Sequence, residues 1–207
     1  MVFALPEGLA PEVYPLAWLV GRWRGEGVVA YPNIPETPVV QDLTVTHDGG
    51  PYLTWSSTVR LAPVAGAEAD GAGAGPGTVW ATEAGFWRVP AERPEGLPED
   101  RHPVELLVTD PAGHLTLYVG AVGNGRIDLV SDLIARTPDA AAMASATRLF
   151  GNVEGDLLWT WDIAAFGEPL QSYFSARLLR VPDGSGAPAP ARPASTSADR
   201  ARSPEDW

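Results

Sequence analysis

The chain has 207 residues, and 45% of them are hydrophobic, which suffices for one domain with a sizeable core. Its formal net charge is −12, and all 14 basic residues are arginines. Nucleic acids and anionic membrane surfaces bind through basic patches, so this balance argues against both as partners. The absence of cysteine excludes disulfides, thiolate metal sites and cysteine nucleophiles. Residues 1–19 lack the basic segment of a secretion signal, and we expect a cytoplasmic protein.

One helical segment is predicted, followed by strands alone. Residues 11–20 are the only helical candidate and are expected to form a short plug before the first strand. Ten runs rich in β-branched and aromatic residues follow, separated by turn sequences such as DGGP at 48–51. This succession predicts an all-β fold, a ten-stranded up-and-down antiparallel β-barrel. The runs are 23–29, 39–47, 53–61, 78–90, 104–109, 114–120, 126–131, 146–153, 157–166 and 170–181.

Two insertions and a tail have a different composition. Residues 62–77 are rich in Ala and Gly and residues 92–102 in Pro and Glu, so both are predicted to be surface loops. Residues 182–207 lack a hydrophobic pattern and are predicted to be disordered. The chain is therefore divided into an N-terminal extension (1–13), a β-barrel (14–181) and this tail.

The first predicted strand carries the motif G-x-W-x-G-x-G, formed by Gly21, Trp23, Gly25 and Gly27. Alternate residues of a strand share a face, and the residues between these four are charged. Trp23 should therefore face the interior and close one end of the barrel. The glycines are expected to leave room for the indole and for the coiling of a small barrel.

Five separated motifs in order resemble those of the nitrobindin family, whose barrel is similar to the fatty-acid-binding proteins and other calycins. The first is the G-x-W-x-G-x-G strand. The others are AYPNI at 30–34, HDGGPYLT at 47–54, EAGFWRV at 83–89 and GEPLQ at 167–171. The resemblance covers about residues 14–181 and implies a ten-stranded barrel with an apolar cavity.

The resemblance also implies a haem site, in which one histidine of the last strand holds the iron. The matching position here is Tyr173, and the lysine that the family places near the haem propionates has no counterpart, since the chain contains no lysine. Losing an imidazole ligand weakens haem retention. The resulting hypothesis is a cavity-type binding protein for a small apolar or amphiphilic ligand, without b-type haem or another cofactor. A homodimer is one candidate assembly. No enzymatic activity is assigned to it unless haem is bound.

Two alternatives give Tyr173 a direct role. Strand alternation would place Ser175 and Arg177 on the same inward face as Tyr173. In the first alternative, Arg177 stabilises a tyrosinate ligand of ferric haem, as in a nitric oxide binder or peroxynitrite isomerase. In the second, Arg177 and Tyr173 clamp the carboxylate of a fatty-acid-like anion. Arg177 would otherwise reach water at the barrel mouth or pair with an inward acid such as Asp162 or Glu83.

The three histidines do not indicate a metal or catalytic site. His102 lies in the Pro/Glu-rich insertion and His114 follows a turn, so both are expected to be exposed. His47 ends a strand and is interpreted as structural. No three-ligand spacing and no Ser/His/Asp arrangement is present in the sequence, so neither a metal site nor catalytic residues are predicted.

Overall fold

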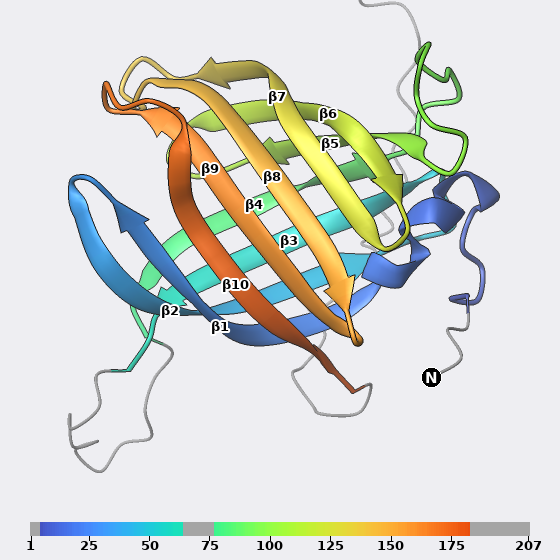
Figure 1. Ribbon diagram of the computed structural model, residues 1–207. Helices are drawn as coiled ribbons and strands as arrows, with labels where there is room; N and C mark the ends of the chain where they lie inside the picture. The colour runs from blue at the N-terminus through green and yellow to red at the C-terminus, as the bar shows by residue number, and fades with distance from the viewer. Residues whose placement is uncertain (1–4, 64–76, 183–207) are drawn as a thin grey trace, which may run out of the picture.

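The computed structural model describes residues 5–63 and 77–182, which form a closed antiparallel barrel of ten strands (Figure 1). Each strand pairs with the next along the chain, and β1 closes the ring by pairing with β10. The predicted up-and-down barrel is therefore confirmed. The predicted disordered tail and most of the first insertion lie outside the described residues. The strands are β1 (Gly21–Tyr31), β2 (Ile34–Thr46), β3 (Tyr52–Leu61), β4 (Val79–Arg88), β5 (His102–Thr109), β6 (His114–Gly123), β7 (Arg126–Arg136), β8 (Met143–Val153), β9 (Asp156–Ala165) and β10 (Gln171–Val181).

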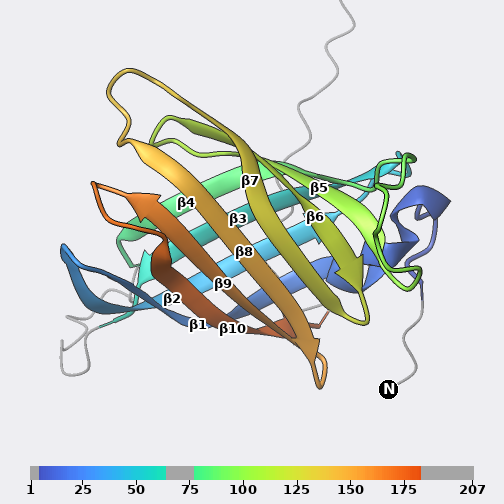
Figure 2. The same ribbon diagram turned by 45° about the horizontal axis from the view of Figure 1, so that its top comes forward.

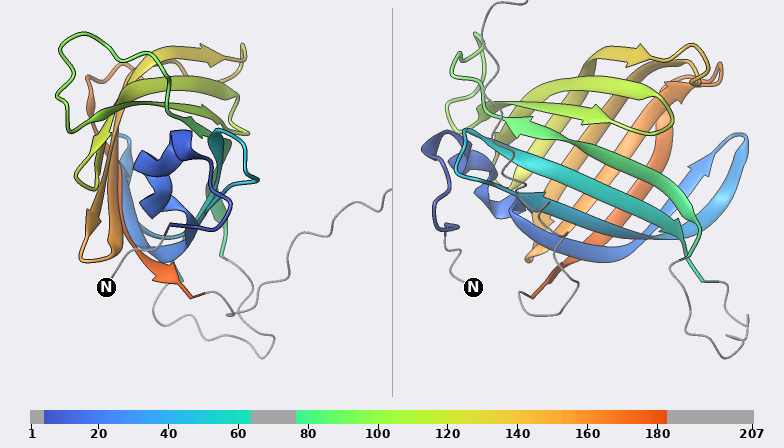
Figure 3. Two further views of the ribbon diagram at one scale, coloured as in Figure 1. Left: turned by 90° about the vertical axis from the view of Figure 1, so that its right-hand side faces the viewer. Right: turned by 180° about the vertical axis from the view of Figure 1, so that it is seen from behind.

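A short 3-10 helix, η1 (Pro11–Leu19), plugs one end of the barrel, and Figure 3 (left) shows it inside the ring of strands. Its Val13, Leu16 and Leu19 are fully buried. The predicted boundary of the barrel at residue 14 therefore falls within a packed element. No helix among the described residues is long and apolar enough to cross a membrane.

Trp23 occupies the position that its motif predicts. Its ring is buried against η1, and the indole Nε1 donates a hydrogen bond to the carbonyl oxygen of Leu19 at 2.8 Å. The guanidinium of Arg180 lies 4.2 Å from the centre of the same ring, within the range of a cation–π contact. One indole thus links the plug, the first strand and the last strand.

The glycines of the motif make room chiefly for the backbone of β10. A Cβ at Gly25 would lie 2.0 Å from the carbonyl oxygen of Arg177, and one at Gly27 would lie 2.6 Å from that of Ser175. Both distances are below any tolerated contact, so β1 and β10 can approach only because these side chains are missing. Gly21 adopts a φ of 140°, which side chains disfavour.

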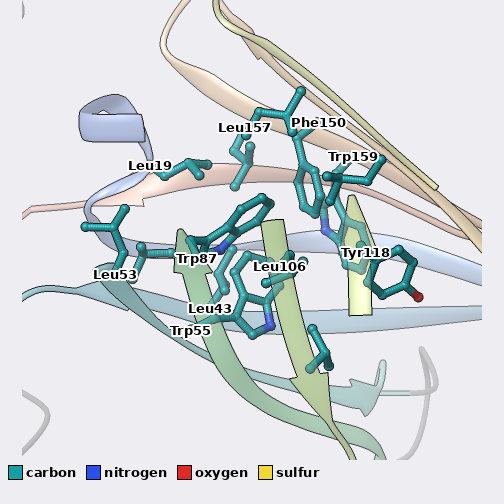
Figure 4. Packing of buried hydrophobic residues seen from close by; sticks show 14 of the residues in the cluster. Leu19, Leu43, Leu53, Trp55, Trp87, Leu106, Tyr118, Phe150, Leu157 and Trp159 are labelled. Carbon is teal, nitrogen blue, oxygen red and sulfur yellow. The ribbon is translucent and has the colours of Figure 1, made fainter. Parts of the chain in front are cut away.

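Beyond the plug, the interior is filled by a cluster of stacked and edge-packed rings, shown in Figure 4. Trp87 lies 5.8 Å from Trp55 and 5.4 Å from Phe150, centre to centre. Phe150 stacks on Trp159 at 5.3 Å. These aromatic contacts fill this half of the barrel with side chains.

The opposite end of the barrel carries the hairpins that join β1 to β2 and β9 to β10, as Figure 1 and Figure 2 both show. The pairing is incomplete on two sides of this end. β5 ends at Thr109, so segment 79–83 of β4 extends beyond it, and β7 pairs with β8 only as far as Val130 although both strands continue. The barrel therefore opens at this end instead of closing over packed side chains.

Candidate ligand-binding cavity

A cavity of about 400 Å³ occupies the open end of the barrel. Its wall is mostly apolar and aromatic, with two carboxylates, a threonine, a tyrosine and a histidine among the lining residues. A second compartment of about 20 Å³ lies beside it and shares Trp80, Ala81, Glu83, Trp161 and Tyr173 with it. The cavity is lined by Ile34, Trp80, Ala81, Thr82, Glu83, Asp110, Pro111, Ala112, His114, Ala141, Met143, Trp161, Ile163, Ala165, Phe166 and Tyr173.

Tyr173 lies at an irregularity of β10 and lines the cavity. Ser172 pairs with Asp162 and Phe174 pairs with Trp161, so Tyr173 is an extra residue between two consecutive pairs. Such a bulge shifts the alternation of the strand by one residue. The rings of Tyr173 and Phe174 can therefore both face the interior.

This bulge makes the predicted placement of Arg177 and Ser175 wrong. After it, Phe174, Ala176 and Leu178 are the more buried residues, whereas Ser175 and Arg177 are exposed. The Arg177 side chain is 65% exposed and its Nε donates to Asp156 Oδ2 at 2.7 Å, on the outside of the barrel. Arg177 is therefore not placed to bind the carboxylate of an anion in the cavity. Nor does it lie beside Tyr173, where its charge was expected to favour a tyrosinate.

The Tyr173 hydroxyl accepts a hydrogen bond from Trp80 Nε1 at 2.9 Å. Burial raises the pKa of Tyr173 above the ordinary value of 10, and the charges of Glu83 and Asp110 raise it further. The Trp80 hydrogen bond acts in the opposite direction but does not reverse the shift of the pKa. Tyr173 is therefore a neutral phenol at physiological pH.

A buried ion pair stands between the cavity and the packed core. Arg148 of β8 donates to Glu83 of β4 through both terminal nitrogens, one of them at 2.9 Å, and the two residues are only 2% and 7% exposed. The guanidinium also lies 4.5 Å from the Trp161 ring and 4.9 Å from the Tyr118 ring. Burial disfavours the charged guanidinium, yet Glu83 and Tyr118 outweigh it, and the pKa of Arg148 lies above its usual value.

Arg148 was not among the predicted site residues. Glu83 was expected as an inward acid, like Asp162, but as a partner of Arg177. The available signal was the alternation at 146–150, where Arg148 shares the inward face of the strand with Ala146 and Phe150, both fully buried. A charge on an apolar strand face requires an inward partner, and Glu83 supplies it.

His114 was predicted to be exposed, and this prediction is wrong. Its side chain is 12% exposed and lines the cavity. Nδ1 lies 3.3 Å from Asp110 Oδ2, and Nε2 lies 2.8 Å from the carbonyl oxygen of Ala141. The imidazole therefore connects the β5–β6 turn to the segment that precedes β8. The sequence contained one indication of this placement, namely Asp110, an acidic partner four residues earlier in the same turn.

The other two histidines lie apart from the cavity. His102 is exposed, as predicted, and His47 is half-buried with no hydrogen-bond partner for its Nδ1. Within residues 5–63 and 77–182, no three or more His, Cys, Asp or Glu side chains are grouped so that they could hold a metal ion.

A closed antiparallel ten-stranded barrel with a plug at one end and an internal apolar cavity at the other belongs to the calycin-like class of small-molecule-binding barrels. Residues 12–180 match the family described as "THAP4-like, heme-binding beta-barrel domain". The chain belongs to this nitrobindin-like haem-binding barrel family.

Named relatives and a solved structure are similar over most of the chain. The ferric nitrobindin-like protein of Beutenbergia cavernae is 46% identical over 210 residues, covering 87% of this chain and 100% of the relative. The peroxynitrite isomerase of Nocardioides sp. is 39% identical over 180 residues, covering 87% and 99%. The crystal structure of Rv2717c from M. tuberculosis has a TM-score of 0.65 at 28% identity, covering 84% of this chain and 99% of that one.

Proposed function

We propose that this protein is a nitrobindin-like binding protein, working in the cytoplasm, whose cavity takes a small apolar ligand and does not hold b-type haem in the manner of its family. The observation that carries the proposal is the state of Tyr173, which stands where the resemblance places the iron-ligating histidine. A phenol binds ferric iron well only as phenolate. Burial and two carboxylates keep the proton on Tyr173, and Trp80 already occupies a lone pair of its oxygen.

The lining of the cavity is also poorly suited to the charged propionate edge of haem. Haem carries two propionates, which need cationic partners, yet the lining residues within the described part of the chain include neither arginine nor lysine. Arg148 compensates the charge of Glu83, but the second lining carboxylate, Asp110, would repel them. The aromatic walls and the volume suit a planar apolar ligand, for which pockets of roughly 300–1,000 Å³ are typical. Shape is therefore compatible with haem, but neither the iron ligand nor the charges fit it.

A second candidate is a ferric haem protein that isomerises peroxynitrite, with Tyr173 as the iron ligand. Two observations favour it: several relatives bear the name peroxynitrite isomerase, and the phenol does line the cavity. In this candidate Tyr173 must lose its proton close to Glu83 and Asp110. It must do so without Arg177, which lies on the outer face.

Haem titration of the purified protein separates the two candidates. We expect no stoichiometric Soret band for the wild type, and a gain of haem binding for Tyr173→His, whose imidazole needs no cation to bind iron. Tyr173→Phe serves as the matched control, since it removes only the hydroxyl. Tight uptake by the wild type with a tyrosinate-like spectrum that disappears in Tyr173→Phe would overturn the proposal.

A further inference from the structure

We infer that the cavity selects neutral planar aromatic molecules that carry a hydrogen-bond acceptor, with the Tyr173 hydroxyl as the donor that recognises it. This inference rests on the proposed function, because it assigns the cavity to a small ligand other than haem. It depends on the balance of donors and acceptors in the wall, the charge of the wall and the shape of its aromatic groups.

The Tyr173 hydroxyl has one unused donor. A phenol offers one proton and accepts through its oxygen. Its oxygen accepts from Trp80 Nε1, and among the described residues this is the only hydrogen bond of the hydroxyl. The raised pKa keeps the proton in place. Tyr173 therefore presents an O–H group to a molecule in the cavity, with its oxygen oriented by Trp80.

The two carboxylates of the wall are already engaged within the protein. Both oxygens of Glu83 receive hydrogen bonds from Arg148. Asp110 accepts the backbone N–H of His114 through Oδ1, and its Oδ2 faces the imidazole. A ligand with a hydrogen-bond acceptor thus finds a donor at Tyr173, whereas a donor-only ligand would have to share a carboxylate oxygen with one of these internal partners.

Charge and shape narrow the class of ligand. Arg148 neutralises the charge of Glu83, but Asp110 remains, and the described lining residues include neither arginine nor lysine, so the wall disfavours an anion. The indoles of Trp80 and Trp161 and the ring of Phe166 form much of the wall, and Trp161 packs edge-on to Tyr173 at 5.2 Å. Such surfaces favour flat aromatic molecules. The remaining class is a neutral aromatic molecule with a ring nitrogen or carbonyl oxygen.

Three probes of nearly equal shape test this assignment: quinoline, which has a ring nitrogen acceptor, naphthalene, which has none, and 2-naphthoate, which is anionic. Their dissociation constants are to be measured by calorimetric titration at neutral pH. One net hydrogen bond corresponds to a preference of about threefold to tenfold. We therefore expect quinoline to bind about threefold to tenfold more tightly than naphthalene, and 2-naphthoate to bind most weakly.

Tyr173→Phe should bring quinoline and naphthalene to equal affinity. Tyr31→Phe is the matched control: it also removes an inward hydroxyl, from a ring 6.0 Å from that of Tyr173, but this hydroxyl bonds Ile163 and Ala165 and does not line the cavity. It should retain the preference for quinoline.

Several results would overturn the inference. They are equal affinities in the wild type, a preference that persists in Tyr173→Phe, tightest binding of 2-naphthoate, and no saturable binding of any probe. The wild-type ratio is decisive even if a variant folds poorly. Haem uptake by the wild type would count against the proposed function alone, since the ratio of the two neutral probes measures the donor separately.

Discussion

The two ends of this barrel use the same residue types for different purposes. At the plugged end, the indoles of Trp23, Trp55 and Trp87 are at most 2% exposed and pack against η1 and one another. At the open end, Trp80 and Trp161 are only partly buried and line a cavity. The difference lies in the strands: glycines let β1 and β10 approach closely, whereas β4 extends beyond the end of β5 at the open end. Whether an indole is core or cavity wall is thus decided by its neighbours.

The Glu83–Arg148 pair marks the boundary between the two ends. Arg148 lies over Trp159, which belongs to the packed cluster, and over Trp161, which lines the cavity. A buried ion pair is weak evidence for net stability, but removing one partner leaves an uncompensated charge. The first prediction tests this boundary.

Arg148→Met should have the largest effect, lowering the free energy of unfolding by about 3–5 kcal/mol, because it leaves the Glu83 carboxylate buried without its partner. Denaturant unfolding at neutral pH measures this. The double variant Glu83→Gln with Arg148→Met should recover much of the loss, since no buried charge then remains. A loss below about 1 kcal/mol in the single variant would show that water reaches Glu83 freely.

Trp87→Leu and Trp80→Leu compare the ends directly. Trp87 is fully buried, so its replacement leaves a void and should reduce the free energy of unfolding by about 2–3 kcal/mol, somewhat less than a Trp→Ala change. Trp80 borders a cavity, and its replacement should remove less than about 1.5 kcal/mol. Equal losses in denaturant unfolding would mean that the open end is packed as tightly as the plugged end.

Tyr173→Phe should lower the free energy of unfolding by about 0.5–1.5 kcal/mol at pH 7, because Trp80 loses its acceptor. The pKa of Tyr173 is raised in the folded protein, so its stabilising contribution is complete below about pH 10. It is lost as the pH rises through the folded value, since the unfolded chain releases the proton first. The difference between variant and wild type should narrow above pH 10 in unfolding measured from pH 7 to 11. A difference that stays constant would contradict the assigned shift.

Arg177→Ala should have the smallest effect, about 0.5 kcal/mol or less, because exposed ion pairs contribute little. It should also leave the affinities for quinoline and 2-naphthoate unchanged. A selective loss of 2-naphthoate binding would instead indicate that the guanidinium reaches the cavity, as strict alternation along β10 had predicted.

Most of the architecture could be predicted because it depends on short-range patterns. Residues with period-two alternation and the turns between them indicated ten strands, and the alternation of the first motif placed Trp23 inside. The limits of several strands were less accurate. The run predicted at 126–131 continues as β7 to Arg136, because the backbone of this segment goes on pairing with β6.

The candidate site was predicted less well, and each error has a physical cause. Arg177 was predicted to face inward because unbroken alternation along the strand was assumed. The extra residue at Tyr173 reverses the alternation, and a single-residue bulge has no periodic pattern that the sequence would show. His114 was predicted to be exposed because it follows a turn. The prediction failed because the carbonyl that contacts its Nε2 belongs to Ala141, 27 residues away in the sequence. Both errors concern contacts between segments, which alternation within one strand does not report.

The sequence by itself determined the barrel and the plugging indole, because these follow from local periodicity and from motifs within single strands. The match of the Tyr173 phenol to the family's iron ligand stays a prediction from the resemblance. Only the tertiary structure decided the environment of that phenol. Closure of the barrel brings Trp80 to Tyr173 across 93 residues and Arg148 to Glu83 across 65. Burial then sets the charges of these groups, because the energy of a charge depends on what surrounds it in space and not on its neighbours along the chain.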